Sequence, residues 1–404
     1  MKKKIFLLFF LWIILGATMA QDIYTSGYFI NPSGQKVAAV FKNDVIIYRR
    51  DGEGKDLYSS SMAIDTLTDD IYWVSNSNPV GDIANGYGCV MKNDEVLLDN
   101  ELGTCINSIS FDGNDLYAAG FYNDYYESVG AVWKNGEPTP LYIYGETARR
   151  SEILGVVAVD GTVYACGYYS NGVNYGCVWV NGDLYACYPY QKVVDITYSD
   201  GDIYYLVEDS QTTVYKSGQE FCSLHTNSNY TMAAYDIKVA EGDVYTVGFM
   251  GFNDCCVWKN SEIIYLHPYA RNADFRACQF FGQSLYYVGW DHEDHGLVFK
   301  DGEQIADPRS QYYYDIYVRP SMLDVDDVQT EQITVFPNPA KDRITIKGLD
   351  HSEIANIFNA TGQLVMTVTG EEGNEIDVSD LPAGLYLVHC GNRVLRFVKD
   401  YPHY

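Results

Sequence analysis

Short apolar runs separated by turn residues repeat along the chain between residues 22 and 319. The most regular run places a tyrosine among aliphatic residues, and in most copies a glycine follows three positions later, as in Asp22–Gly27 and Gly242–Gly248. Seven tyrosines mark these runs: Tyr24, Tyr72, Tyr117, Tyr164, Tyr204, Tyr245 and Tyr286. They recur every 40 to 48 residues, and such a period in sequence rich in strand formers is typical of β-propeller blades.

Each copy contains further predicted strands around the tyrosine run. Downstream, an apolar strand ends in an aromatic residue or methionine before a tight turn and a short outer strand, as at Val132–Gly136 and Val257–Ser261. The Asn-Gly and Asp-Gly pairs in many of these turns accept the positive φ angles that two-residue hairpins need. An upstream strand carries a small or aliphatic apolar residue eight positions before the tyrosine: Ile64, Ile109, Val156, Ile196, Ile237 and Cys278.

The two ends of the repeat region are incomplete in complementary ways. The first copy lacks an upstream strand, whereas the last upstream strand, residues 312–318, has no tyrosine run after it. Pairing of this strand with the run around Tyr24 would complete one blade and remove exposed sheet edges. We therefore predict an all-β fold with a seven-bladed β-propeller over residues 21–320. The repeated aromatic anchors should pack between sheets, and the lysine after most of them should be an exposed neighbour or a turn charge.

The pattern changes after residue 320. Residues 321–332 are acidic and do not repeat, so we interpret them as a linker. Residues 333–400 contain seven short alternating segments, which predict a small immunoglobulin-like β-sandwich within a second domain, residues 333–404.

Four segments of this second domain carry a family resemblance: Val335–Ala340, Ile357–Val365, Val378–Leu387 and Arg396–Lys399. Their order and spacing resemble the type A carboxy-terminal sorting domain of the type IX secretion system. The matching positions are Phe336, Pro337, Asn338, Pro339, Gly362, Leu381, Pro382, Gly384 and Tyr386. The resemblance implies a protein of the Bacteroidetes group that crosses the outer membrane, loses this domain to a sortase-like protease, and is released or attached to surface lipopolysaccharide. The repeat region resembles exported bacterial proteins with no assigned activity.

The first twenty residues have the features of a signal peptide. Lys2–Lys4 precede the apolar run Ile5–Leu15, and small residues lead up to a cleavage position after Ala20. No later apolar run is long enough for a transmembrane helix. The formal net charge of −27 disfavours nucleic acid as a partner, because phosphates would be repelled. We therefore expect a protein that is secreted or carried to the cell surface through the periplasm.

The ten cysteines do not form a disulfide or zinc pattern. Cys89, Cys177 and Cys256 occupy a position that is alanine or threonine in other copies, and Cys166 occupies an alanine position. This exchange favours free, buried thiols that act as small apolar residues.

No local motif assigns a catalytic residue, a metal site or a cofactor. Nucleophile elbows, phosphate-binding loops and His-Glu-x-x-His are missing from the sequence. The cluster Asp291–His295 is compatible with a divalent metal, but consecutive loop residues usually point apart, so we favour a solvated acidic loop. Paired carboxylates contributed by different blades would leave no local spacing, so that possibility stays open.

Aromatic residues beside Asn and Asp recur in the loops of one predicted face. The candidate ligand-binding residues are Tyr122, Tyr125, Tyr126, Tyr168, Tyr169, Phe252 and Trp290. Such side chains suit the recognition of a glycan or a protein, although the high tyrosine content alone would also place rings in loops. We expect a non-catalytic binding protein; the alternative is a propeller-type polysaccharide hydrolase or lyase. Carboxylates converging from several blades would favour the enzyme, and a mouth lined by Tyr and Asn would favour binding.

Overall fold

The computed structural model describes most of the chain after the predicted signal peptide. The described residues are 21–52, 54–66, 68–77, 87–99, 103–124, 127–143, 150–209, 211–225, 232–251, 254–267, 273–291, 293, 295–321, 334–347, 354–359, 364–369, 375–390 and 393–400. Within these ranges the regular elements are strands, and none contains a helix that is long and apolar enough to cross a membrane. The all-β prediction is therefore confirmed. The predicted signal peptide and nearly all of the predicted linker lie outside the described residues.

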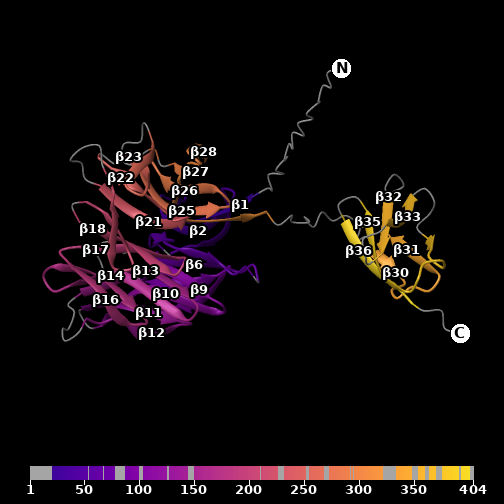
Figure 1. Ribbon diagram of the computed structural model, residues 1–404, viewed down its shortest axis with the longest axis horizontal. Coiled ribbons are helices and arrows are strands. Elements are labelled where there is room, and N and C mark those ends of the chain that lie inside the picture. Colours follow the sequence, from indigo (N-terminus) through magenta and orange to yellow (C-terminus); the bar gives the residue numbers. More distant parts are fainter. Residues whose placement is uncertain are drawn as a thin grey trace, which may run out of the picture. The chain divides into compact units, whose positions relative to one another are not determined.

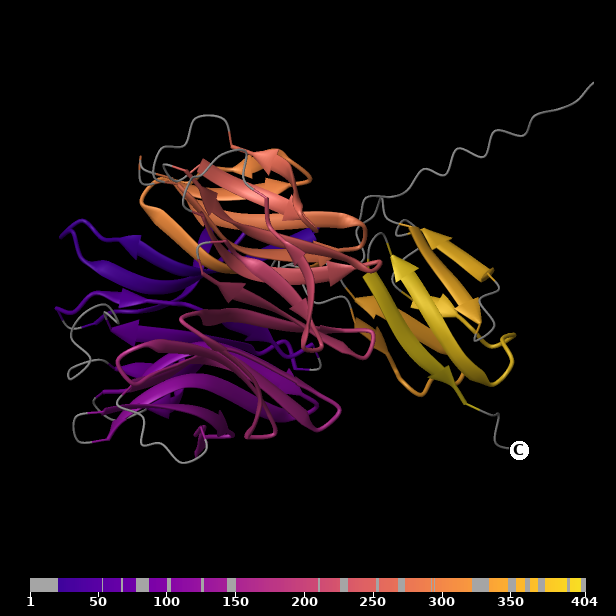
Figure 2. The ribbon, with the colours of Figure 1, turned by 60° about the vertical axis from the view of Figure 1, so that its left-hand side comes forward.

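The chain divides into two compact units, Met1–Ser321 and Met322–Tyr404. Figures 1 and 2 show the strands of the first unit in indigo to orange and those of the second in yellow tones.

The first unit consists of consecutive antiparallel strand groups. In each group the upstream strand is followed by the tyrosine strand, the anchor strand and a short outer strand. The group that joins the two ends of the unit contains β29 (Gln311–Pro320), β1 (Gln21–Ile30), β2 (Lys36–Lys42) and β3 (Val45–Arg50). In the next group β4 (Leu57–Tyr58) and β5 (Met62–Ile64) both pair with β6 (Ile71–Ser77), which is followed by β7 (Gly88–Lys92) and β8 (Glu95–Asp99). The remaining five groups are β9 (Cys105–Asp112), β10 (Asp115–Asp124), β11 (Glu127–Lys134) and β12 (Glu137–Pro140); β13 (Arg150–Val159), β14 (Thr162–Ser170), β15 (Asn174–Val180) and β16 (Asp183–Pro189); β17 (Lys192–Ser199), β18 (Asp202–Glu208), β19 (Thr213–Lys216) and β20 (Gln219–Ser223); β21 (Met232–Ala240), β22 (Asp243–Met250), β23 (Asp254–Lys259) and β24 (Glu262–Leu266); and β25 (Asp274–Phe281), β26 (Ser284–Trp290), β27 (Gly296–Lys300) and β28 (Glu303–Ala306). A single parallel bridge between Ser128 and Arg150 joins the β9–β12 and β13–β16 groups into one sheet.

The last strand of the first unit pairs with its first strand. In β29, Tyr317 lies opposite Tyr24 and Ile316 lies opposite Thr25, in an antiparallel register that extends to Gln21 and Pro320. Figure 1 shows the orange end of the unit beside the indigo β1. The predicted pairing of residues 312–318 with the tyrosine run around Tyr24 is therefore confirmed.

Glycine in the tyrosine strand is explained by a bulge in the neighbouring upstream strand. In the β21–β22 pair the register shifts between Ala234 and Asp236, which brings the carbonyl oxygen of Ala233 against Gly248. A Cβ on Gly248 would lie 2.0 Å from that oxygen. A Cβ added to Gly27, Gly120, Gly167 or Gly289 would likewise lie 1.8–2.1 Å from a backbone carbonyl oxygen. The repeated glycine therefore permits close approach of two strands.

The apolar core of the first unit lies between successive strand groups. The seven apolar positions of the upstream strands, including Cys278 and Ile316, are 0–7% exposed, and the anchors Trp133, Trp179 and Trp258 are at most 4% exposed. One cluster packs Phe41 of β2 and Tyr313 of β29 against Tyr286 of β26, so it joins the β25–β28 group to the β29–β3 group. The interpretation of the anchors as core residues is confirmed.

The lysine after the anchor is an exposed neighbour, as predicted for Lys134, whose side chain is 52% exposed, and it also has a specific partner. Lys134 lies 2.7 Å from the Asp115 carboxylate, and its ammonium group sits 5.4 Å from the ring centre of Tyr117. The same arrangement recurs for Lys42, Lys92, Lys216 and Lys259. The following Asn135 accepts a hydrogen bond from the Leu116 backbone N–H at 2.8 Å. The repeated Lys-Asn pair therefore ties the anchor turn to the start of the tyrosine strand.

The second unit contains two antiparallel sheets that share one core. One sheet has the order β30 (Thr334–Phe336), β31 (Arg343–Lys347) and β34 (Glu375–Asp377). The other has the order β33 (Leu364–Thr369), β32 (Ile354–Asn359), β35 (Gly384–Cys390) and β36 (Arg393–Lys399). Ile344 and Ile376 of the first sheet pack with Ile357, Val388 and Phe397 of the second. The seven strands described in this unit agree in number with the seven predicted segments.

Nine cysteines have described side chains, and all nine are free thiols in the structure. Cys187 is exposed, Cys222 is half-buried, and the other seven are buried. Burial raises the pKa of the Cys89 thiol to about 11, as expected for a thiol in apolar surroundings. The burial of seven of these nine side chains agrees with the expectation that the cysteines act as small apolar residues.

Candidate binding site at the upstream strands

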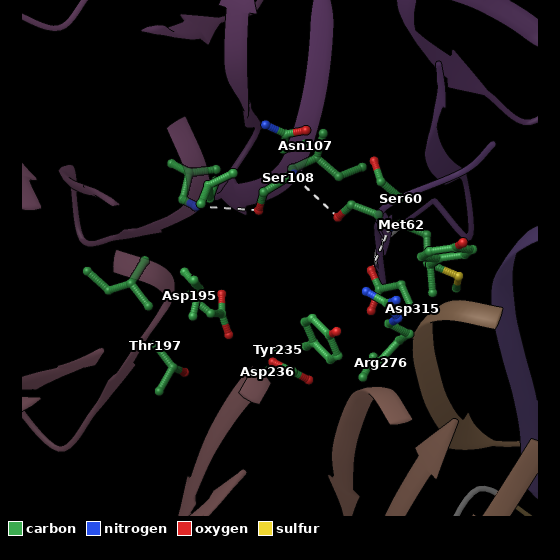
Figure 3. A pocket seen from close by; sticks show the side chains of 18 of the residues that line it. Ser60, Met62, Asn107, Ser108, Asp195, Thr197, Tyr235, Asp236, Arg276 and Asp315 are labelled. Carbon is green, nitrogen blue, oxygen red and sulfur yellow. Dashed lines mark hydrogen bonds between the residues drawn. The ribbon is translucent and has the colours of Figure 1, made fainter. Parts of the chain in front are cut away.

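A cavity of about 400 Å³ lies among the upstream strands of the first unit. Figure 3 looks into it. Its lining residues lie within the segments 60–62, 107–109, 154–157, 194–197, 235–238, 276–279 and 314–316, one segment from each strand group. The repeat brings these segments together because every upstream strand holds the same place in its group.

Three aspartates from three strand groups face this cavity. Each precedes the buried apolar residue of its strand: Asp195 in β17, Asp236 in β21 and Asp315 in β29. Figure 3 shows the three carboxylates around the same open space.

Each carboxylate also joins its strand to the next upstream strand. Asp315 Oδ2 accepts a hydrogen bond from the Met62 N–H at 2.7 Å. The carboxylates of Asp195 and Asp236 accept from the Ile237 and Cys278 N–H groups at 3.0 and 2.7 Å. Serine makes the equivalent link in other groups, from Ser61 to Ile109 and from Ser108 to Val156.

The aspartates and one lysine form a charged cluster with opposed pKa shifts. Burial and the neighbouring charge of Asp236 raise the pKa of Asp195. Burial acts to raise the pKa of Asp236 too, but the ammonium group of Lys238, 2.5 Å from Oδ1, and a hydrogen bond with Asp195 lower it. Burial raises the pKa of Asp315 to about 6. Of this pair, Asp195 is therefore the carboxyl that holds a proton more readily, and Asp236 the one that stays ionised more readily.

Lys238 balances part of this charge. Burial acts to lower its pKa, but the charges of Asp236 and Asp195 outweigh burial and raise it. Its side chain keeps 36% of its surface accessible. Because Lys238 lines the cavity, that accessible surface faces the cavity.

An arginine surrounded by aromatic rings lies at the edge of the cavity. The Arg276 guanidinium carbon is 4.0 Å from the ring centre of Tyr235, 5.5 Å from that of Tyr314 and 5.7 Å from that of Trp290. An Arg276 nitrogen donates to Asp274 Oδ2 at 2.6 Å. We call Tyr235, Asp274, Arg276, Trp290 and Tyr314 the arginine cluster.

Three polar atoms of the arginine cluster have no hydrogen-bond partner among the described residues. They are Asp274 Oδ1, Arg276 Nε and Trp290 Nε1, and all three are buried. Buried polar atoms are nearly always hydrogen-bonded to protein or to ordered solvent. One acceptor and two donors of the arginine cluster are therefore left unsatisfied by the described residues.

A second polar group connects to the cavity wall through Asn107. Its Nδ2 atom donates to Glu152 Oε1 at 3.1 Å, and the Tyr168 hydroxyl donates to Glu152 Oε2 at 2.7 Å. The Lys192 ammonium group lies 4.6 Å from the ring centre of Tyr168. These side chains satisfy one another, unlike those of the arginine cluster.

The structure places the predicted ligand-binding residues in different surroundings. Trp290 joins the arginine cluster, and Tyr168 joins the Asn107 group. Tyr169 is 4% exposed and packs in the core between strand groups. Tyr122 is half-buried, with its ring edge-on to Trp133 at 6.3 Å. The remaining three, Tyr125, Tyr126 and Phe252, lie outside the described residues.

The acidic loop Asp291–His295 is described only in part. Asp291 Oδ1 accepts hydrogen bonds from the Glu293 and His295 N–H groups at 2.9 and 3.1 Å. The Nδ1 atom of His295 lies 3.7 Å from Asp291 Oδ2. In the described part of the loop, Asp291 thus acts as a turn residue.

Sequence reasoning missed Asp195, Asp236, Asp315 and Arg276. A signal was present, because the residue before the buried apolar position is Asp or Ser in several copies and Gly or Ala in others. When the residue at an inward-facing position of a repeat is polar in some copies and small in others, that position is a candidate for lining a cavity.

The residues of the sorting-domain motif hold the second unit together. Asn338 Oδ1 accepts from the Val398 N–H at 2.9 Å, and its Nδ2 atom donates to the Arg396 carbonyl at 3.3 Å. The Tyr386 hydroxyl donates to the Pro382 carbonyl at 2.7 Å, and its ring stacks on Phe397 at 5.3 Å. Of the other predicted motif positions, Phe336, Leu381 and Gly384 lie in or beside strands of this unit, Pro337 and Pro339 flank Asn338, and Gly362 lies outside the described residues.

Residues 334–400 match the family model of the secretion system C-terminal sorting domain. These residues form a sorting domain. The match confirms the resemblance recognised in the four motif segments. The protein is therefore secreted to the cell surface, with the sorting domain directing its export through the type IX system.

No curated protein sequence matches this chain. Among solved structures, the computationally designed Ika8 protein is 14% identical, with a TM-score of 0.41, over 84% of this chain and 96% of its own. The WD40 β-propeller domain of Doa1 is 12% identical, with a TM-score of 0.35, over 74% and 93%. The extracellular domain of a hybrid two-component system from B. thetaiotaomicron is 9% identical, with a TM-score of 0.41, over 93% of this chain and 62% of its own. We draw no functional conclusion from likenesses this distant.

Proposed function

We propose that the first unit is a seven-bladed β-propeller and the second an immunoglobulin-like sandwich. Seven repeated strand groups, each contributing one segment to the cavity wall, support the propeller. So does the Phe41–Tyr313–Tyr286 cluster, because it packs the last strand group against the first. Two sheets around one core support the sandwich.

We propose that this protein binds an extracellular glycan at the arginine cluster and catalyses no reaction. The observation that carries this proposal is the set of three buried polar atoms without partners, beside three aromatic rings. A sugar hydroxyl can both donate and accept, so neighbouring hydroxyls match Asp274 Oδ1, Arg276 Nε and Trp290 Nε1. Tyrosine and tryptophan rings can pack against the apolar C–H face of a sugar ring.

Three carboxylates from different strand groups converge on the cavity, which is the arrangement expected of the enzyme, but their hydrogen bonds support binding over catalysis. Both oxygens of Asp315 accept backbone hydrogen bonds, from Met62 and Ile316. Those of Asp236 are occupied by Lys238 and the Cys278 N–H. Carboxylates held in this way stabilise the strand arrangement, and they are poorly placed to attack or protonate a substrate.

A polysaccharide hydrolase is the second candidate, and one observation favours it. The opposed pKa shifts of Asp195 and Asp236 resemble those of a general acid beside an ionised partner. Asp195→Asn separates the two proposals. A hydrolase would lose activity toward the glycan that it binds, whereas a binding protein would show no turnover before or after the substitution.

The test of the binding proposal is a glycan array with the full mature chain, followed by titration of the glycan that is captured. Arg276→Gln should weaken its affinity by on the order of 10-fold to 100-fold, because a charged hydrogen bond contributes about 1.5–3 kcal/mol. Trp290→Phe should also weaken it, because the indole N–H is lost.

Tyr190→Ser is the matched control, since this tyrosine is 77% exposed and does not belong to the arginine cluster. It should leave affinity and melting temperature unchanged. Unaltered glycan affinity in both Arg276→Gln and Trp290→Phe, with folding intact, would show that the arginine cluster is not the binding site.

The expected partners are the type IX secretion machinery and its sortase, which would recognise the second unit. Surface lipopolysaccharide is the expected attachment point if the sortase transfers the first unit instead of releasing it. Both proposals are supported by the sorting-domain match.

A further inference from the structure

Two cysteines face each other across the outermost strand pair of one group. Cys177 of β15 and Cys187 of β16 are register partners, and their sulfur atoms are 3.5 Å apart. Cys177 is buried and Cys187 is exposed. We infer that Cys177 and Cys187 form a disulfide bond once the protein has been exported.

The backbone geometry at this position suits a disulfide. The Tyr190 N–H donates to the Asn174 carbonyl, so positions 174 and 190 form a hydrogen-bonded pair. Pairs alternate along an antiparallel ladder, which makes the Cys177–Cys187 pair a non-hydrogen-bonded one. By the same alternation Pro189, two residues from Cys187, also belongs to a non-hydrogen-bonded pair. Its lack of an N–H agrees with that assignment. The Cα atoms of such pairs are about 4.5 Å apart, within the range that a disulfide spans.

Equivalent pairs in other strand groups show that the side chains at this register meet. Thr213 and Ser223 occupy the same position in the β19–β20 pair, and their hydroxyl oxygens are 3.0 Å apart. Two other cysteines at this register lack a cysteine opposite: Cys89 faces Asp99, and Cys256 faces Leu266. The two side chains at this register position are therefore close together because of the strand pairing itself. Among the described residues, only the β15–β16 pair has a cysteine on both strands there.

The compartment supplies the oxidant. Outside the inner membrane, protein disulfides of thiol oxidoreductases accept electrons from paired thiols. The exposed Cys187 thiolate would attack such a disulfide, form a mixed disulfide and release one thiolate of the oxidant. The Cys177 thiolate would then attack the Cys187 sulfur and expel the second thiolate. Two thiols thus lose two protons and two electrons, and the oxidant's disulfide becomes two thiols.

The experiment compares the full chain exported to the periplasm with a form kept in the cytoplasm by removal of residues 1–20. Free thiols are alkylated under denaturing conditions, and the protein is mapped by non-reducing peptide mass spectrometry. The exported form should lack two alkylated thiols and yield a cross-linked peptide pair containing Cys177 and Cys187. The cytoplasmic form should be alkylated at both, and oxidised glutathione should close the bond in the purified reduced protein.

Cys187→Ser should abolish the cross-link, while Cys89→Ser, which removes a cysteine that faces Asp99, should leave it unchanged. In hydrogen exchange, reduction should speed the exchange of β16 amides and leave β20 amides unaffected, because the Thr213–Ser223 pair cannot be reduced. Full alkylation of both cysteines in the exported protein and after glutathione treatment would overturn the inference. So would a cross-link joining Cys187 to any other cysteine.

Discussion

Replacing Gly248 with alanine is expected to destabilise the first unit by about 3 kcal/mol. The new Cβ would lie 2.0 Å from the Ala233 carbonyl oxygen and 2.9 Å from the Ala234 Cα. Ordinary van der Waals contact begins near 3.4 Å. Backbone in the core of the unit would have to move by roughly 1.4 Å, and overpacking of this kind typically costs about 1–3 kcal/mol, with backbone obstacles at the upper end.

Gly282→Ala provides the matched control. Gly282 has φ near 61°, and a Cβ there would meet nothing within 4 Å. Its replacement introduces backbone strain without a clash, so we expect a loss of about 1 kcal/mol. The two substitutions add the same methyl group, but only at Gly248 does that group clash with neighbouring backbone.

Denaturant unfolding followed by tryptophan fluorescence measures the effect on the first unit alone. All five tryptophans after residue 20 lie between Trp73 and Trp290, so the second unit contributes no signal. Linear extrapolation then gives the free energy of unfolding for each variant. The reasoning is refuted if Gly248→Ala costs no more than Gly282→Ala.

Three further predictions concern the strand ends, the cavity and the second unit. Deleting residues 310–320 removes β29 and its pairing with β1, so the first unit should lose stability in one cooperative step; an unchanged melting temperature would contradict this. The pKa of Asp315 is about 6 in the folded protein and near 3.8 when unfolded, so between about pH 4 and pH 6 the folded state binds more of this proton than the unfolded state does. The contribution of this carboxyl to the free energy of unfolding should therefore fall as the pH rises from about 4 to 6. The stability of Asp315→Asn should lack that fall, and parallel pH profiles for the two proteins would contradict the assignment. A chain ending at residue 321 should fold and reach the periplasm but not the cell surface, as fractionation and proteinase accessibility would show; normal surface display would exclude the second unit as the sorting signal.

Local sequence determined the strands, their turns and the pairing of the chain's two repeat ends. A tyrosine strand, an anchor and an Asn-Gly turn each specify a backbone conformation within a few residues, and alternation along a strand specifies which side chains are buried. The burial of Trp179 and Trp258 and the pairing of Ile316 with Thr25 were predictable for that reason. The sorting domain was recognisable because its turn residues, such as Asn338, make structural contacts that restrict their identity.

Only the tertiary structure decided which side chains from different strand groups meet. Asp195, Asp236 and Asp315 are separated by 41 and 79 residues in the chain, yet the repeat places them around one cavity. The bulge in the upstream strand decides where Tyr235 and Arg276 lie, because it shifts the register beside them. Tyr169 looked like a loop residue but is buried, since β14 extends to Ser170 and carries that ring into the core. The periodicity of the sequence predicts which face of a strand a residue occupies. Contacts between sheets depend in addition on strand lengths and bulges, and strand lengths and bulges are set only when the sheets pack.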